Sequence, residues 1–315
     1  LHDREQVGEV VAQHVARDRD RVESLADALE REPARVGRGE DLDLHAVHVV
    51  GEAEGRRPLL LIHGWPVSGA TFRRVLPHLA RCATCHVVDL PGAGASRFTS
   101  TTSLSLDLHV AGIRAVVDGL GLDDVVVVGH DSGGMLARHA LAGDGRVRAF
   151  GLIDTEQPQG MGWRFRSFVV ARRAPGLAAA LGWVAARPAV YRNQFVFGGA
   201  FADRSLLEGE FAEFFLRPLH ERPEARAAAA RLLRSFHPRF VTDLAALHRR
   251  IEVPVGLVWG EHDLFFPIAR AKEMASTFPR TTLSVIGGAG LFSHEERPEE
   301  VAAATAATTA RLLGR

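Results

Sequence analysis

Six short apolar runs constrain the fold of this 315-residue chain more than any other feature. They lie at residues 59–62, 85–90, 125–128, 149–154, 253–260 and 282–287. Helix-like stretches separate the first four runs, and one more separates the last two. Uninterrupted apolar runs that alternate with helices are typical of a parallel sheet with both faces covered. The sequence therefore predicts an α/β fold built on a mostly parallel sheet.

The segments before the first run have a different pattern. Residues 3–31 are charged with scattered apolar positions, which predicts one or two amphipathic helices on the outside of the domain. The stretch LHAVHVV at 44–50 and the turn GEAEGRRP at 51–58 predict a hairpin that leads into the first run.

The alternation of runs and helices breaks between the fourth and fifth runs. We predict core residues 1–155 with a helical extension over 1–40, a helical cap over 156–248, and the rest of the core over 249–315. We expect most aromatic residues of the cap to form its own core and some to line a pocket against the sheet. These aromatic residues are Trp163, Phe165, Phe168, Trp183, Tyr191, Phe195, Phe197, Phe211, Phe214 and Phe215.

Composition narrows the class of protein. The formal net charge is zero, which argues against a nucleic-acid or membrane-surface partner. The polar amino terminus does not resemble a signal peptide, so we expect a cytoplasmic protein, monomeric or homodimeric. Cys82 and Cys85 stand alone as a C-x-x-C pair before an apolar run, and no second pair completes a zinc site. We therefore expect neither a metal nor a cofactor.

The stretch VVVVGHDSGG at 125–134 carries the strongest signal of chemistry. A strand followed by G-x-nucleophile-x-G and a helix is a nucleophile elbow, whose strained turn requires small residues on both sides of the nucleophile. Centring the motif on Asp131 gives Gly129 and Gly133 as flanks, whereas centring it on Ser132 places His130 at a flank that must be small. The spacing therefore favours Asp131. A carboxylate attacks an electrophilic carbon and forms an alkyl-enzyme ester, which water then cleaves.

A second motif, LLLIHGWPVSG at 59–69, ends a strand in H-G-x-P. In such an architecture this strand lies beside the elbow. We expect the backbone N–H groups of Trp65 and Ser132 to form an oxyanion hole for the tetrahedral intermediate.

Four ordered motifs, HGWP, DLPGAGAS, GHDSGG and WGEHDLFFP, resemble the α/β-hydrolase superfamily over residues 45–312. The aspartate in the elbow is similar to that of its epoxide hydrolase and haloalkane dehalogenase branch. The resemblance implies an eight-stranded, mostly parallel sheet with helices on both faces and a helical cap. It also implies a catalytic order of nucleophile, acid and histidine. The acid motif matches at Asp263, and Asp154, after an earlier strand, is the alternative acid.

The histidine position of that family departs from the pattern. The motif that usually begins G-H-F begins here as AGLFSHEERPEE at 289–300, which places Leu291 where the histidine is expected. Leucine cannot accept a proton from the hydrolytic water. Three interpretations remain open: a hydrolase blocked at the ester, a repurposed fold, or rescue by His294.

The resemblance favours an epoxide as substrate, because many dehalogenases carry Asn at the position of Trp65 and Trp at that of Ser132. Related epoxide hydrolases use two cap tyrosines to polarise the ring oxygen, and this chain has only Tyr191. Trp183 is a candidate second donor, as are Trp163 and His237. We expect a small hydrophobic organic substrate. Dehalogenation is the alternative reaction, and a ligand-binding protein or a lyase or cyclase on the same fold is the alternative class.

Overall fold

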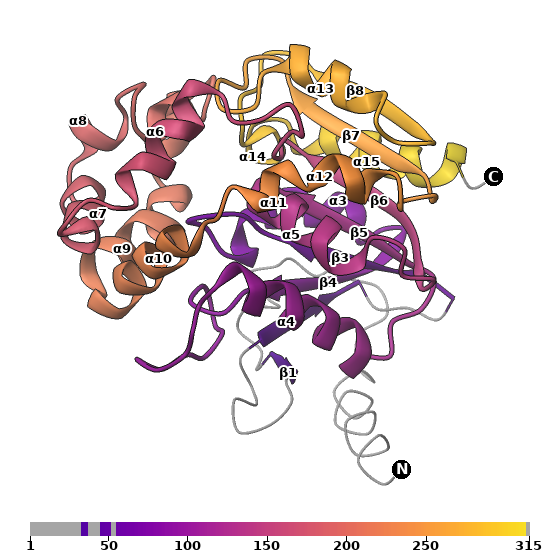
Figure 1. The fold of residues 1–315 in the computed structure, drawn as a ribbon, viewed down its shortest axis with the longest axis horizontal. Helices are drawn as coiled ribbons and strands as arrows, with labels where there is room; N and C mark the ends of the chain where they lie inside the picture. The colour runs from indigo at the N-terminus through magenta and orange to yellow at the C-terminus, as the bar shows by residue number, and fades with distance from the viewer. Residues whose placement is uncertain (1–32, 37–44, 52–54, 313–315) are drawn as a thin grey trace, which may run out of the picture.

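The structure, a computed structural model, describes residues 33–36, 45–51 and 55–312. Within these ranges eight strands form one sheet in the order β1-β2-β4-β3-β5-β6-β7-β8 (Figure 1). The strands are β1 (Ala34–Val36), β2 (His45–Val50), β3 (Arg57–Ile62), β4 (Ala83–Asp89), β5 (Val125–His130), β6 (Val147–Ile153), β7 (Val255–Gly260) and β8 (Thr281–Ile286). The predicted α/β fold with an eight-stranded, mostly parallel sheet is confirmed.

The sheet is parallel from β4 to β8 and antiparallel at its other edge. β2 pairs antiparallel with both β1 and β4, and β4 separates it from β3. The predicted hairpin at 44–58 is therefore wrong, because the strands on either side of that turn are not neighbours. The helices predicted over 3–31 lie outside the described residues. Within the predicted helical extension, Ala34–Val36 form a strand instead, because they extend the sheet edge along β2.

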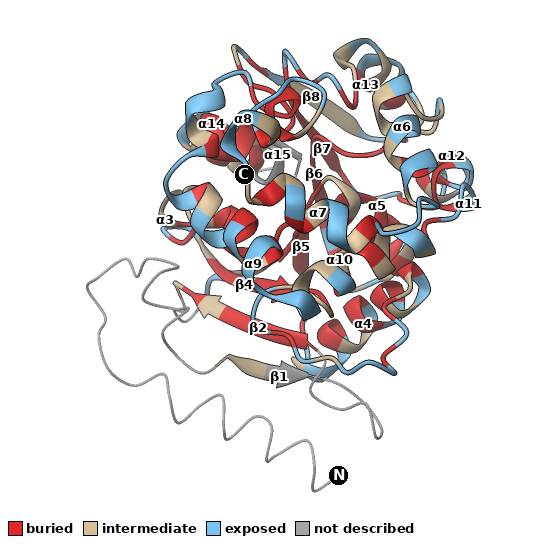
Figure 2. Cartoon of the chain, turned by 90° about the vertical axis from the view of Figure 1, so that its left-hand side faces the viewer, coloured by how far each residue is buried: buried red, intermediate tan, exposed pale blue. Residues whose placement is uncertain are grey.

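The central strands are buried on both faces, as their continuous apolar sequences require (Figure 2). Alternate side chains of β5 point to opposite faces. Val125 and Val127 belong to one apolar cluster, and Val126 and Val128 belong to the other. All four valines of the run are therefore buried, with two side chains on each face of the sheet.

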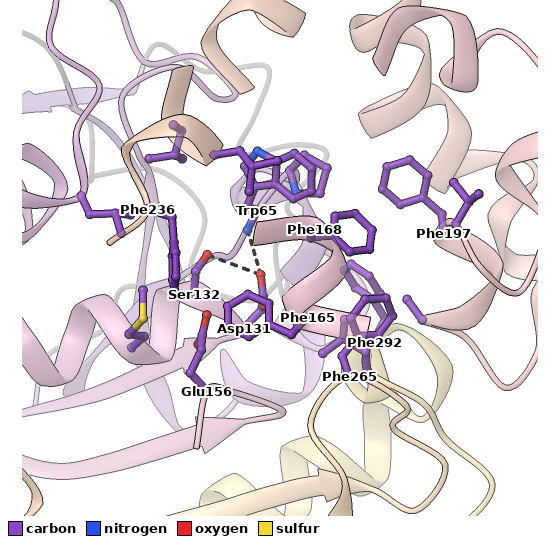
Figure 3. Close-up of a pocket in the computed structure, with 18 residues that line it drawn as sticks. Trp65, Asp131, Ser132, Glu156, Phe165, Phe168, Phe197, Phe236, Phe265 and Phe292 are labelled. Atoms are coloured by element: carbon purple, nitrogen blue, oxygen red, sulfur yellow. Dashed lines mark hydrogen bonds between the residues drawn. The ribbon is translucent and has the colours of Figure 1, made fainter. Parts of the chain in front are cut away.

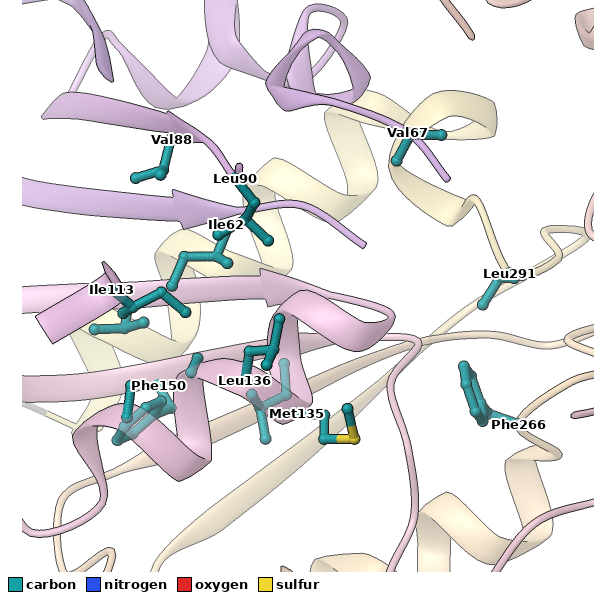
Figure 4. Packing of buried hydrophobic residues seen from close by; sticks show 14 of the residues in the cluster. Ile62, Val67, Val88, Leu90, Ile113, Met135, Leu136, Phe150, Phe266 and Leu291 are labelled. Carbon is teal, nitrogen blue, oxygen red and sulfur yellow. The ribbon is translucent and has the colours of Figure 1, made fainter. Parts of the chain in front are cut away.

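Helices cover both faces. α4 (Leu106–Gly119), α5 (Ser132–Leu141) and α13 (Ile268–Ala275) pack into the first cluster, part of which Figure 4 shows around Ile113, Leu136 and Phe150. α3 (Leu76–Leu79) and α15 (Pro298–Leu312) pack into the second cluster. Shorter helical segments are η1 (Gly69–Phe72), α12 (Leu244–His248) and α14 (Ser293–Glu296).

A helical insertion lies between β6 and β7, on the left of Figure 1. Its helices are α6 (Trp163–Ala171), α7 (Leu177–Ala185), α8 (Pro188–Tyr191), η2 (Phe197–Gly199), η3 (Arg204–Leu207), η4 (Ala212–Leu216), α9 (Arg217–Glu221) and α10 (Pro223–Ser235). α11 (Arg239–Thr242) and α12 follow and lead back to the core, where both lie against α5 (Figure 1). We refer to this insertion as the cap. None of the helices in the described part of the chain is long and apolar enough to cross a membrane.

Candidate active site

The turn between β5 and α5 holds Asp131 in a strained conformation, with φ at +50°. A Cβ atom built on Gly129 would lie 2.5 Å from the Cα atom of Gly134, and one built on Gly133 would lie 2.2 Å from the carbonyl oxygen of Ile62. Neither neighbour is a flexible side chain, so both flanking positions require glycine. The local geometry therefore centres the elbow on Asp131.

The carboxylate of Asp131 is held by N–H donors from two loops. The backbone N–H of Trp65 donates to Oδ2 at 2.9 Å (Figure 3). The backbone N–H of Ser132 also donates to this carboxylate. The Ser132 hydroxyl lies 3.4 Å from the same Oδ2. A Cβ atom on Gly64 would lie 2.3 Å from Oδ2, so the HGWP loop approaches the nucleophile as closely as a glycine permits.

Burial raises the pKa of Asp131 to about 6, and the N–H donors of Ser132 and Trp65 act in the opposite direction. The carboxyl is therefore mostly ionised at neutral pH, as a nucleophile must be.

The Asp131 side chain faces a pocket between the core and the cap that is lined mostly by apolar residues (Figure 3). Cap residues Phe165, Phe168, Phe197 and Phe236 meet core residues Phe265 and Phe292 there. Such a pocket favours an apolar ligand, with a few polar groups to orient it.

One polar group in this pocket, Glu156, is a site residue that the sequence reasoning missed. Its side chain lines the pocket and is 2% exposed. Burial raises its pKa to about 8, and the nearby charge of Asp131 adds to this rise. A signal for it existed in the sequence, because Glu156 comes two residues after the end of the apolar run 149–154. Ligand sites of parallel sheets lie beyond the carboxyl ends of their strands.

The two candidate acids have different surroundings. Oδ1 of Asp263 accepts hydrogen bonds from the backbone N–H groups of Phe265 and Phe266 at 2.7 and 3.0 Å, while Oδ2 is buried without a hydrogen-bond partner. Asp154 accepts from the Gly260 N–H at 2.7 Å and from the Ser293 hydroxyl at 2.5 Å. Burial raises the pKa of both carboxyls. Asp154 is thus bonded through both oxygens to structural neighbours, whereas Asp263 keeps one oxygen free.

Leu291 lines the pocket together with Asp131 and is 7% exposed. His294 does not line it. Its Nε2 atom lies 2.8 Å from the Thr71 hydroxyl, and its ring packs against His130 at 4.3 Å between centroids. The fully buried ring has its pKa lowered well below the ordinary value, mainly by burial. This geometry does not bring His294 to the nucleophile.

The structure also does not bring the predicted cap donors to the pocket. Tyr191 is buried in the cap core and Trp183 is half exposed with the Arg187 guanidinium 4.5 Å from its ring, and neither lines the pocket. Trp163 and His237 are also absent from the lining. Tyr191 packs among other apolar residues, whereas Trp163, Trp183 and His237 are exposed.

No group of three or more His, Cys, Asp or Glu side chains within the described ranges could hold a metal ion. Cys82 is exposed and Cys85 is buried, and both are free thiols.

A strained nucleophile elbow at the carboxyl edge of a mostly parallel sheet is the arrangement that distinguishes α/β hydrolases. The family described as alpha/beta hydrolase fold matches residues 57–298, and the chain belongs to this family.

Some of the named relatives belong to the branch that the motifs indicate, and others are esterases. Haloalkane dehalogenase 2 of Mycobacterium tuberculosis is 28% identical over 269 residues, which cover 82% of this chain and 89% of that protein. A soluble epoxide hydrolase of Corynebacterium sp. is 39% identical over 93 residues, or 30% of this chain and 32% of that protein.

Among solved structures, a haloalkane dehalogenase from Bradyrhizobium elkani superposes with a TM-score of 0.72 at 22% identity, covering 85% of this chain and 94% of that one. This last likeness concerns the fold. The resemblance stated from the motifs is confirmed, and the chain is an α/β hydrolase related to dehalogenases and epoxide hydrolases.

Proposed function

We propose that this protein opens the epoxide ring of a small apolar compound by nucleophilic attack of Asp131. The observation that carries the proposal is the placement of the Asp131 carboxylate in the apolar pocket, with Oδ2 held by the Trp65 N–H at 2.9 Å. Oδ2, the oxygen held by Trp65, becomes the carbonyl oxygen of the ester, and Oδ1 is the atom that attacks the ring carbon. In the resulting ester the N–H groups of Trp65 and Ser132 face the carbonyl oxygen, where charge develops during hydrolysis.

The surroundings of Trp65 support an epoxide over a halide. A leaving halide is best stabilised by N–H donors that point into the pocket. The indole N–H of Trp65 instead donates to the carbonyl oxygen of Ala229 at 2.9 Å, and the residue after the nucleophile is Ser132.

Dehalogenation is the second candidate, because relatives named as haloalkane dehalogenases align over most of the chain. A haloalkane would form the same ester on Asp131, so the two functions share the first covalent step.

The second half-reaction lacks the usual base, because Leu291 stands where a histidine would activate water. The unpartnered Oδ2 of Asp263 supports its assignment as the acid, since this oxygen is free to accept from such a histidine. We therefore expect hydrolysis of the ester to be slower than its formation. The protein would then accumulate the covalent ester.

Intact-mass measurement with a panel of epoxides and haloalkanes tests the proposal, with the modified peptide mapped. We expect an adduct on Asp131 that is absent in Asp131→Asn. Leu291→His should increase turnover, and Leu264→His, at an exposed leucine, is the matched control that should not. Failure of every electrophile to label Asp131 or to give product would count against the carboxylate mechanism and favour a ligand-binding protein or a lyase.

A further inference from the structure

Ring opening leaves a negative charge on the former epoxide oxygen, and a proton donor in the pocket is needed to neutralise it. Tyr191 and Trp183 do not line the pocket. The Trp65 indole N–H is bonded to Ala229. Of the described residues that line the pocket, only Asp131 and Glu156 have acidic side chains, and Asp131 is the nucleophile.

We infer that Glu156 is the general acid that donates its proton to the epoxide oxygen while Asp131 attacks the ring carbon. The inference rests on the proposed function. In this step the bond between Asp131 Oδ1 and carbon forms, and the ring carbon–oxygen bond breaks with its electron pair going to oxygen. That oxygen takes the Glu156 proton. Asp131 becomes a neutral ester and Glu156 becomes a carboxylate, so one negative charge passes between them and the net charge is unchanged.

The position of Glu156 is fixed by buried partners. Its backbone oxygen accepts from the Arg138 guanidinium at 2.9 Å, and its Oε2 atom lies 3.0 Å from the Thr155 hydroxyl. The side chain is 2% exposed, and its carboxyl lies on the same side of the pocket as Asp131 and Ser132 (Figure 3). A carboxyl that lines the pocket beside the nucleophile and is held by buried partners meets the positional requirement for a general acid, which must lie near the reacting atoms.

Thr155 supplies a hydrogen-bond donor for the charge that Glu156 acquires. Its hydroxyl lies 2.8 Å from the backbone oxygen of Asp131 and 3.0 Å from Glu156 Oε2, and it accepts from Arg138 at 2.8 Å. A hydroxyl carries one proton and rotates to suit its neighbours. While Glu156 is neutral, the Thr155 hydroxyl can donate this proton to the backbone carbonyl oxygen of Asp131. Once Glu156 is a carboxylate, the same proton can turn to Oε2.

The charges around Glu156 also favour release of its proton once Asp131 has formed the ester. Asp131 from the elbow and Arg138 from α5 are the charged groups that act on Glu156. The Asp131 charge opposes ionisation of Glu156, and Arg138 favours it. When Asp131 becomes a neutral ester, the repulsion disappears and Arg138 remains. The acidity of Glu156 therefore increases as the ring opens.

The test compares two electrophiles with one carbon skeleton, styrene oxide and phenethyl bromide. The bromide leaves as an anion and needs no proton, whereas the epoxide oxygen does. We expect Glu156→Gln, which keeps the shape of the side chain, to slow the combined formation of Asp131 adduct and diol from styrene oxide by roughly 10²–10⁴-fold. The rate with phenethyl bromide should change less than about threefold. Alkylation of the exposed Cys82 thiol is the internal reference for probe reactivity.

The pH dependence of the wild-type protein provides a second test that needs no variant. Because the pKa of Glu156 is raised to about 8, the rate with styrene oxide should fall above that pH, and the rate with phenethyl bromide should not. An equal loss with both electrophiles in Glu156→Gln, or no loss with either, would overturn the assignment of Glu156. If neither probe labels Asp131 or gives product in the wild type, the proposed function itself fails.

Discussion

The Asp263→Asn substitution measures how much the buried carboxyl of Asp263 lowers the free energy of unfolding. Asp263 is 4% exposed, and burial raises its pKa from 3.8 to about 8. Between these values the unfolded chain loses the Asp263 proton while the folded chain keeps it. The free energy of unfolding therefore falls as pH rises through this window, by about 1.36 kcal/mol per pH unit. Below pH 3.8 both states are protonated and this loss is absent.

The expected difference follows from that slope. Asparagine cannot ionise. From pH 5 to pH 8 the free energy of unfolding of the variant should therefore rise, relative to that of the wild type, by on the order of 4 kcal/mol. The amide oxygen can still accept from the N–H groups of Phe265 and Phe266. Its NH₂ group replaces an oxygen without a partner, which costs about 1–3 kcal/mol at every pH. This cost does not depend on pH. The informative quantity is thus how the difference in free energy of unfolding between Asp263→Asn and the wild type changes with pH.

Urea unfolding followed by circular dichroism at pH 5, 6.5 and 8 measures this quantity. Asp123→Asn, at an exposed aspartate, is the control and should show no such trend. A difference between Asp263→Asn and the wild type that stays constant within about 1 kcal/mol across the three pH values would refute the reasoning.

Three further predictions concern the elbow and its support. Gly133→Ala places a Cβ atom 2.2 Å from the Ile62 carbonyl oxygen, so we expect a loss of at least about 1–3 kcal/mol in urea unfolding. Gly145→Ala, where no atom lies within 4 Å, is its control. Alkylation of Asp131 should rise with pH around a midpoint near 6, because the carboxylate is the nucleophile and burial raises its pKa to that value; a rate that is flat from pH 5 to 7 would contradict this. Arg138→Met leaves buried acceptors without their cationic donor and should lower the free energy of unfolding by about 3–5 kcal/mol, so a urea midpoint unchanged from the wild type would contradict the assigned role.

The sheet and the elbow could be predicted because their signals are local. A four-valine run followed by glycines at fixed spacing specifies a buried strand and a strained turn without knowledge of distant contacts. The partner of β2 could not be predicted this way. Its pairing with β4 depends on a strand more than 30 residues later in the chain, whereas sequence proximity favoured the next strand.

The pocket lining was harder to predict than its nucleophile. Phe165 lines the pocket and Trp183 does not, yet both are aromatic residues of short cap helices. Which side of such a helix faces the core depends on the packing of the whole cap, and helices this short show little periodicity. Glu156 was missed for another reason, since a single glutamate after a strand acquires meaning only once its neighbours are known.

Trp65 connects the nucleophile turn of the core to helix α10 of the cap. Its backbone N–H holds the nucleophile at 2.9 Å, and its indole N–H holds the carbonyl oxygen of Ala229 in α10 at 2.9 Å. If α10 moves away from the sheet to admit a substrate, it must break the indole bond or pull the ring with it. The position of α10 and the alignment of the nucleophile are therefore coupled through the two N–H groups of one tryptophan.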